Sequence, residues 1–175
     1  MRSVCPLAGE HQADNAVTAA VALTRLGVSG RAIETGIASA EWPGRLECVC
    51  EQPEIILDGA HNPAGARALA AYIDRFYRQR RVRLIYGAMR DKAVAEIGGV
   101  LFPLSRQVIV TAPRQARALS PDALRDIADH PDLRTAATVK DALALVADAG
   151  PEDVVFVTGS LFLVAEARAI IGAKR

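Results

Sequence analysis

An aspartate, a histidine and an asparagine stand close together in the segment IILDGAHNPAGARAL, residues 55–69. Three apolar residues precede Asp58, and an apolar pattern of helical spacing follows Pro63. This order predicts that Asp58 ends a buried strand and that Asn62 caps a helix with Pro63 in its first position. A carboxylate accepts hydrogen bonds from hydroxyl groups, and a helix N-terminus favours an anion. The turn therefore suits a ligand that combines ribose with phosphate.

A purely structural turn explains the same residues equally well. In that interpretation Asp58 and Asn62 only cap the backbone, and His61 is a solvated loop residue. Two further strand ends bear on the choice: YGAMRDK (86–92) and VTGSLFL (157–163) also place glycine and polar residues directly after apolar runs. Carboxyl ends of parallel strands meet at one edge of a sheet, where ligands bind. Three such ends favour a binding site.

The elements that must position these residues follow from periodicity. Helical patterns cover residues 13–26 and run from Ser29, a predicted cap, to about Ala40, and EWPGR (41–45) then breaks the chain. Strands are expected at 46–51, 54–58, 82–87, 107–112, within 135–150 and at 153–159, and helices at 63–77, 92–104, 120–130, within 135–150 and at 160–172. This alternation predicts an open, mostly parallel α/β sheet with helices on both faces, preceded by a short helical segment.

Composition excludes several classes of protein. The 175 residues are 51% hydrophobic and 23% charged, with a net charge of +1, which is typical of a globular protein without a field for nucleic acid. The arginines of 78–83 end a predicted helix, where cations are favourable, so they do not predict nucleic-acid binding. No apolar run could span a membrane, and MRSVCPLAGEHQ lacks the core of a signal peptide, so a cytoplasmic protein is expected.

Cysteine and tryptophan usage predicts structural roles. An odd count of three cysteines argues against a disulfide framework. Cys48 and Cys50 stand two apart in a predicted strand, so they are expected on one face as packing residues, and no metal site is expected. Trp42 is expected to be a packing anchor at the boundary between the helical segment and the α/β part.

Five segments together resemble the C-terminal part of folylpolyglutamate synthase and dihydrofolate synthase, in the Mur ligase superfamily. They are LAGEHQADNAVTAAVAL (7–23), WPGRLE (42–47), ILDGAHNPAGARAL (56–69), YGAMRDK (86–92) and VTGSLFLVAEAR (157–168). DGAHNP and WPGRLE favour this folate branch over the branches that extend peptidoglycan or cyanophycin precursors. The resemblance implies a Rossmann-like C-terminal domain at 42–175, with 1–41 as the last helices of a central ATP-binding domain.

The resemblance also implies an activity. Family members use ATP and Mg2+ to phosphorylate a carboxylate, and an amino group then attacks the acyl phosphate, so that ADP is released. In the folate branch L-glutamate is added to dihydropteroate or to a folate, and the sequence leaves open which of these acceptors is used.

Seven residues match positions with a role in the family. Asn15 would contact adenine, Asp58 the ribose and Arg45 the phosphates. His61 would lie beside the nucleotide and the incoming amino acid, and with Arg45 it is the expected catalytic group. The expected contacts of the glutamate carboxylates are Lys92, Ser160 and Arg117.

The sequence departs from the family in one large respect. No G-x-x-x-x-G-K-[ST] motif is present, and the family's magnesium ligands and its often carbamylated lysine would lie upstream of residue 1. The chain alone is therefore expected to be inactive, with the P-loop domain as its partner. The alternative is a stand-alone nucleotide-binding or regulatory module without ligase activity.

Overall fold

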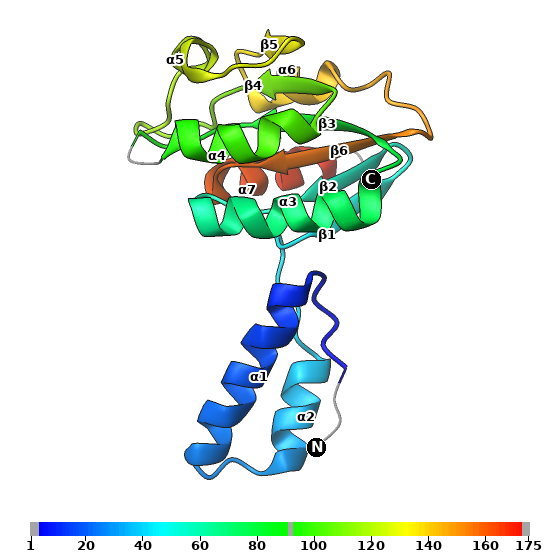
Figure 1. Ribbon diagram of the computed structural model, residues 1–175, viewed down its shortest axis with the longest axis vertical. Coiled ribbons are helices and arrows are strands. Elements are labelled where there is room, and N and C mark those ends of the chain that lie inside the picture. Colours follow the sequence, from blue (N-terminus) through cyan, green and yellow to red (C-terminus); the bar gives the residue numbers. More distant parts are fainter. Residues whose placement is uncertain (1–3, 91–92, 173–175) are drawn as a thin grey trace.

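Two helices form a hairpin that projects from an α/β body in the computed structural model, which describes residues 4–90 and 93–172. The hairpin consists of α1 (Glu10–Arg25) and α2 (Gly30–Ala38), and Ser29 caps α2 by accepting the Ala32 N–H. Residues 39–46 then lead into the body (Figure 1). The predicted helical segment and the predicted break after it are thus both present.

The body contains one six-stranded sheet in the order β1-β2-β6-β3-β4-β5. The strands are β1 (Glu47–Glu51), β2 (Glu54–Leu57), β3 (Arg81–Tyr86), β4 (Gln107–Val110), β5 (Leu133–Thr135) and β6 (Asp153–Thr158). All neighbours pair in parallel except β1, which forms an antiparallel hairpin with β2. The predicted open, mostly parallel sheet is confirmed.

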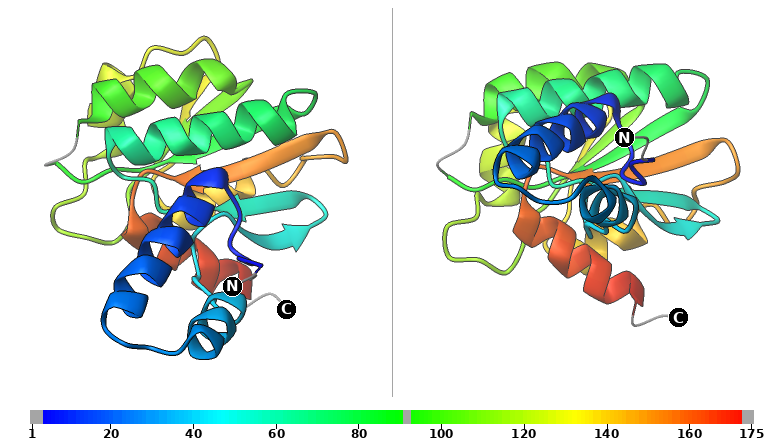
Figure 2. Two further views of the ribbon diagram at one scale, coloured as in Figure 1. Left: turned by 60° about the horizontal axis from the view of Figure 1, so that its bottom comes forward. Right: turned by 90° about the horizontal axis from the view of Figure 1, so that it is seen from below.

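Helices cover both faces of the sheet (Figure 2). One core contains α3 (Pro63–Tyr77), α4 (Val94–Leu101), the 3-10 turn η1 (Phe102–Leu104) and α5 (Pro121–Ile127). The other contains α6 (Val139–Ala144) and α7 (Leu161–Gly172). Because the central strands are covered on both sides, β4 and β6 are buried along their whole lengths, which explains their continuous apolar runs.

Two local expectations differ from the structure. The strand expected within 135–150 begins earlier, at Leu133, and shares only its last residue with that range. In β1 a bulge pairs Cys48 with Ile56 and Cys50 with Ile55. Adjacent residues of β2 face opposite sides of the sheet, so the two cysteines do not share a face. The three cysteines are free thiols.

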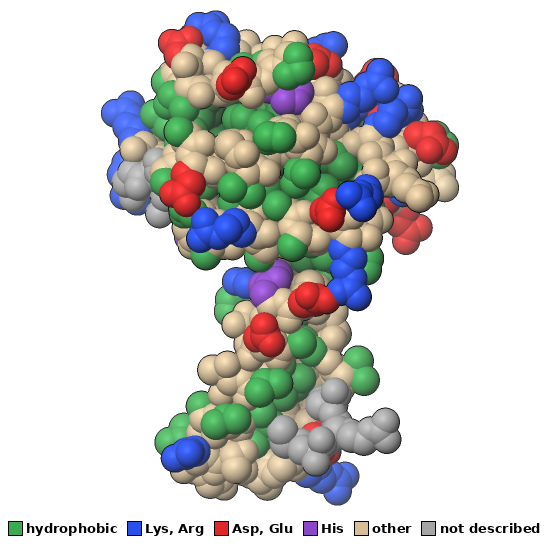
Figure 3. All heavy atoms as spheres, viewed as in Figure 1, with side chains coloured by type: hydrophobic (Ala, Val, Ile, Leu, Met, Phe, Trp, Pro, Cys, Tyr) green, Lys and Arg blue, Asp and Glu red, His purple; other side chains and the backbone are tan. Residues whose placement is uncertain are grey.

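The helical hairpin buries little of its own apolar surface. Only Gln12, Ala20 and Ile33 are buried in α1 and α2, whereas Val17 and Val21 are 64% and 56% exposed. Figure 3 shows hydrophobic side chains spread over the visible face of the hairpin. Elements with so few buried contacts open at a low cost in free energy.

We therefore expect the amides of α1 and α2 to exchange with solvent deuterium much faster than those of β6. Hydrogen exchange of the purified chain, followed by mass spectrometry at several dilutions, measures this difference. Protection of the hairpin equal to that of β6 at every concentration would contradict the expectation. Protection that grows with concentration would show that a second copy covers the hairpin.

Candidate functional site

The three polar strand ends meet at one edge of the sheet, as the sequence predicts. Leu57 pairs with Val157, and Tyr86 pairs with Thr158, so the turns after β2, β6 and β3 lie side by side. Backbone bonds lock the first two turns together: the Asp58 N–H donates to the Val157 carbonyl at 3.0 Å, and the Gly159 N–H donates to the Ala60 carbonyl at 3.0 Å.

A cleft of about 410 Å³ opens beside this edge. Its walls come from the start of α1, from the turn 42–46 and from residues 58–65 at the start of α3. All four residues predicted to bind the nucleotide line it: Asn15, Arg45, Asp58 and His61. Residues from three separate segments therefore converge on one cleft, and their roles in nucleotide binding stay predictions.

Asp58 is buried at the floor of this cleft, with 8% of its surface exposed. Its Oδ1 accepts the Ala60 N–H at 2.9 Å, and its Oδ2 accepts the Leu46 N–H at 3.1 Å. Burial raises the pKa of this carboxyl above its ordinary value, although the two amides and the nearby charges of Arg45 and His11 oppose the rise. Each oxygen keeps a second lone pair for a ligand hydroxyl, so Asp58 can both brace the turn and bind ribose.

The start of α3 is built as predicted. The Asn62 side chain accepts the Gly65 N–H at 2.8 Å, and Pro63 occupies the first helical position. Pro63 has no N–H, and the Gly65 N–H already donates to the Asn62 side chain. Of the first three residues of α3, Ala64 is therefore the one whose N–H can donate to an anion. His61 Nδ1 donates to the Gly59 carbonyl at 2.8 Å, which leaves Nε2 as an acceptor when the ring is neutral.

Arg45 lies at the rim of the cleft, where its guanidinium carbon stands 5.4 Å from the centre of the Trp42 ring. Trp42 is 62% exposed, so the expectation that it anchors a packed boundary is wrong. Trp42 stands in a turn before Pro43 and Gly44, outside any helix or strand. Its sequence position therefore gives no periodic pattern that would show whether its side chain is buried or exposed. In the described part of the chain no carboxylate forms an ion pair with Arg45, so its donors remain available to phosphate.

Gln12 lies behind the wall of the cleft and supports it, and sequence reasoning missed this residue. It is 3% exposed, and its Oε1 accepts from Asn15 Nδ2 at 3.2 Å, while its Nε2 lies 2.8 Å from His11 Nε2. Gln12 thus connects two residues that line the cleft. A glutamine in an otherwise alanine-rich helical pattern could have drawn attention to this position.

The residues expected to bind glutamate do not line this cleft. Ser160 is 2% exposed, and its hydroxyl accepts the Phe162 N–H at 3.2 Å at the start of α7. Arg117 is exposed on the loop after β4, and its carbonyl accepts the Arg90 N–H at 3.0 Å, which joins this loop to the one after β3. Lys92 lies outside the described residues. The glutamate assignments remain predictions.

The described residues contain no group of three His, Cys, Asp or Glu side chains that could hold a metal ion. The donor set of the cleft therefore does not fit a complete Mg2+ site. In the same described part of the chain, no helix is both long and apolar enough to cross a bilayer.

The architecture is an α/β domain with a cleft at the carboxyl edge of its sheet. The chain belongs to the family described as "Mur ligase, glutamate ligase domain", which matches residues 44–161, more than half of its length.

Relatives in the folate branch share both sequence and fold. A probable bifunctional folylpolyglutamate synthase/dihydropteroate synthase of Halobacterium salinarum is 40% identical over 93% of this chain. Folylpolyglutamate synthase of Mycobacterium tuberculosis, solved with ADP and AMPPCP, superposes with a TM-score of 0.88 at 34% identity over 96% of the chain. Escherichia coli FolC, solved with DHPP and ADP, gives a TM-score of 0.84 at 33% identity over 92%.

The chain spans 20%, 41% and 39% of the lengths of these three proteins, respectively. These comparisons confirm the resemblance to the folate branch, because the similarity extends over nearly the whole of this chain. It extends over only part of each relative.

Proposed function

We propose that this chain is the C-terminal domain of an ATP-dependent ligase that adds L-glutamate to dihydropteroate or to a folate. A carboxylate oxygen of the acceptor attacks the γ-phosphorus of ATP, and ADP leaves. The glutamate amine then attacks the acyl carbon, loses a proton and displaces inorganic phosphate. This chain contributes one side of the nucleotide site, and the P-loop domain that the family resemblance implies holds the other.

One observation carries the proposal: Asn15, Arg45, Asp58 and His61 line a single cleft at the carboxyl edge of the sheet. An amide suits the edge of adenine, a carboxylate suits the ribose hydroxyls and a guanidinium suits the phosphates. The M. tuberculosis and E. coli relatives were both solved with adenine nucleotides, which fits this cleft.

We place the glutamate at the neighbouring loops. The loops after β3 and β4 are joined by an antiparallel bridge between Met89 and Ala118. The Gly87 N–H donates to the Thr158 carbonyl at 3.2 Å, which brings the first loop next to the segment that leads into α7. Lys92, Arg117 and Ser160 belong to these segments, and cationic side chains suit the two carboxylates of glutamate. We assign Mg2+ and its ligands to the P-loop domain.

Binding of ADP to the chain tests the nucleotide cleft. In amide correlation NMR spectra, millimolar ADP should shift the signals of Asn15 and of the non-proline residues of 42–47 and 58–65, and inorganic pyrophosphate should leave Asn15 unmoved. Signals at the amino ends of the strands should stay in place with either compound. Shifts spread evenly over the surface, or none at all, would contradict the assignment.

Replacing Asp58 by alanine should both raise the KM for ATP and lower kcat in the complete ligase, by which we mean this chain together with its P-loop domain. The ribose loses a charged acceptor, a loss of about 1.5–3 kcal/mol, or roughly 10- to 100-fold in KM. The Leu46 N–H also loses its acceptor, so the Arg45 turn loosens. A comparison of ATP with 2′,3′-dideoxy-ATP separates these effects, because only the wild type should prefer ATP. A variant that keeps this preference would rule out Asp58 as the ribose ligand.

The matches to folate-branch ligases support the ligase and not the alternative of a stand-alone nucleotide-binding module. Such a module would bind ADP in the same cleft, yet would gain no ligase activity when the P-loop domain is supplied. ADP binding alone therefore cannot decide between the two, whereas the ligation assay can.

A further inference from the structure

Arg45 stands on a short turn, residues 42–46, that is tied to the α/β body at several points. The Gly44 carbonyl accepts the Gly59 N–H at 2.8 Å, and the Leu46 N–H donates to Asp58. The Arg45 N–H closes the turn on the Trp42 carbonyl at 3.3 Å. These bonds connect the turn to the floor of the cleft.

The turn has an unfavourable backbone. Leu46 has a φ of +46°, in the left-handed region that side chains rarely adopt, whereas Gly44 adopts its φ of +75° without strain because it has no Cβ. A Cβ on Gly44 would lie 2.7 Å from Val164 Cγ1 of α7, so the turn is pressed closely against that helix. A strained conformation persists only where its surroundings hold it.

Glu47 and Arg168 supply this restraint from the other side. Glu47 Oε2 accepts the Gly44 N–H at 2.7 Å, and Arg168 Nε donates to both Glu47 oxygens at 3.0 and 3.1 Å. The two residues are 121 positions apart and join the start of β1 to α7. Their side chains are 24% and 51% exposed, and half-exposed pairs contribute little to global stability.

We propose that Glu47 and Arg168 are positioning residues for Arg45. Glu47 holds the Gly44 amide, Arg168 holds Glu47, and the turn thereby presents the guanidinium to the cleft in one fixed orientation. Arg45 then moves with the α/β body rather than with the helical hairpin. The inference rests on the proposed function for its catalytic consequence, while its structural part needs neither nucleotide nor activity.

Trp42 reports the turn directly, because it is the only tryptophan in the chain and stacks against Arg45. Its fluorescence anisotropy and its quenching by acrylamide measure the mobility of the turn in the purified chain. In Glu47→Ala the anisotropy should fall and quenching should rise, with nearly unchanged thermal midpoint. Arg168→Ala should show a smaller change because Glu47 still holds Gly44, and Arg168→Lys should restore most of the wild-type signal.

Two controls remove comparable ion pairs elsewhere. Glu96→Ala breaks the pair with Arg67, and Arg134→Ala breaks the pair with Asp132. Both should leave the Trp42 signal unchanged. A pair that merely fastens β1 to α7 would lower the thermal midpoint without altering Trp42, and an unaltered signal in Glu47→Ala would overturn the proposal.

Kinetics of the complete ligase test the consequence. Misplacement of Arg45 should lower kcat in Glu47→Ala by about 10- to 100-fold with a much smaller change in the KM for ATP. If Glu47→Ala makes Trp42 mobile but leaves kcat unchanged, while Arg45→Ala lowers kcat, the proposal is also overturned. An inactive wild-type ligase would instead contradict the proposed function, and the fluorescence result would still decide whether the pair orders the turn.

Discussion

Replacing Arg45 by alanine should lower kcat of the complete ligase by about 10²- to 10³-fold, the cost of losing one donor aimed at developing charge. The guanidinium stands at the rim of the cleft, stacks on Trp42 and forms no ion pair with a described carboxylate. We expect it to stabilise the transferring phosphoryl group more than ground-state ATP. The KM for ATP should therefore change much less than kcat, which steady-state kinetics with varied ATP will measure.

Arg67→Ala is the matched control, because this arginine lies on α3 and pairs with Glu96 away from the cleft. It should leave both kinetic constants within about twofold, as for other exposed ion pairs. Arg45→Lys should recover only part of the lost rate, since lysine keeps the charge without the planar fork of donors. A raised KM with unchanged kcat in Arg45→Ala would show that Arg45 serves binding alone.

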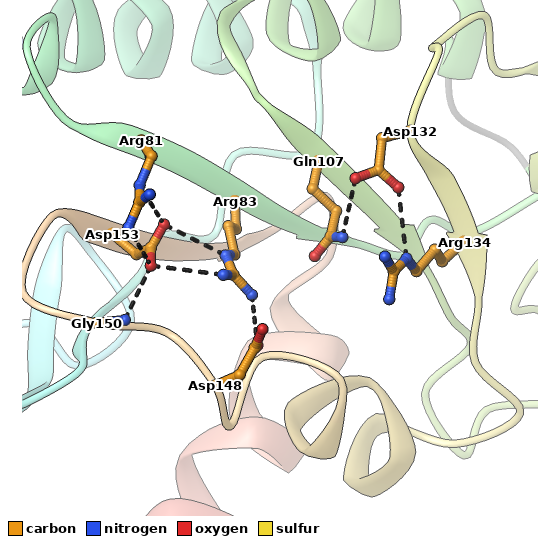
Figure 4. A network of polar contacts seen from close by, with 8 residues as sticks. All are labelled: Arg81, Arg83, Gln107, Asp132, Arg134, Asp148, Gly150 and Asp153. Atoms are coloured by element: carbon orange, nitrogen blue, oxygen red, sulfur yellow. Dashed lines mark hydrogen bonds and ion pairs between the residues drawn. The ribbon is translucent and has the colours of Figure 1, made fainter.

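Replacing Asp153 by asparagine should cost about 2–4 kcal/mol of unfolding free energy at pH 7, because breaking a buried pair leaves uncompensated charge. The side chain is 2% exposed, and its two oxygens contact Arg81 and Arg83 at 3.1 to 3.4 Å, while Oδ2 also accepts the Gly150 N–H at 2.8 Å (Figure 4). Arg83 also pairs with Asp148 at 2.6 Å. The arginine cluster of 78–83 is thus largely occupied in holding β3 to β6.

The pH dependence of this effect has a definite sign. Burial alone would raise the pKa of Asp153, but the Gly150 amide and the charges of Arg83 and Arg81 outweigh it and hold the pKa below its ordinary value. The carboxylate therefore stabilises the fold above the unfolded pKa of about 3.9, and this stability is lost as pH falls through the lower folded pKa. The wild type and Asp153→Asn should differ most near neutrality and converge in acid.

Urea denaturation followed by circular dichroism at pH 7 and in acid measures both quantities. Asp74→Asn is the control: this aspartate is 58% exposed and pairs with Arg78 one turn away, so the change should stay within about 0.5 kcal/mol. Equal losses for Asp153→Asn at both pH values would show that the side chain contributes packing or shape rather than charge.

Much of the architecture follows from local patterns. Ser29 and Asn62 cap their helices as their sequence positions predict, and continuous apolar runs mark the central strands. These signals are local, because a cap or a buried strand depends on residues only a few positions apart. The antiparallel pairing of β1 and its bulge depend on the partner strand β2. The alternation of apolar and polar residues in LECVCE (46–51) cannot reveal either of them.

In the candidate site, too, local patterns predict some features and long-range contacts set the others. Asp58 and Asn62 could be placed from one segment, since a strand end and a helix start fix them both. The amides that occupy the Asp58 oxygens come partly from Leu46, and the restraint on the Arg45 turn comes from Arg168 on the last helix. Such long-range contacts leave no periodic signal in a single sequence.

Glutamate-dependent release of ADP tests whether this chain completes a glutamate ligase when its P-loop domain is present. The chain is assayed alone, and again after it is joined to its P-loop domain, with ATP, Mg2+ and either dihydropteroate or a folate. We predict no release from the chain alone, and from the complete ligase a release that needs both glutamate and acceptor. ADP binding in the cleft without ligation of either acceptor would contradict the proposed ligase function and favour a stand-alone nucleotide-binding module.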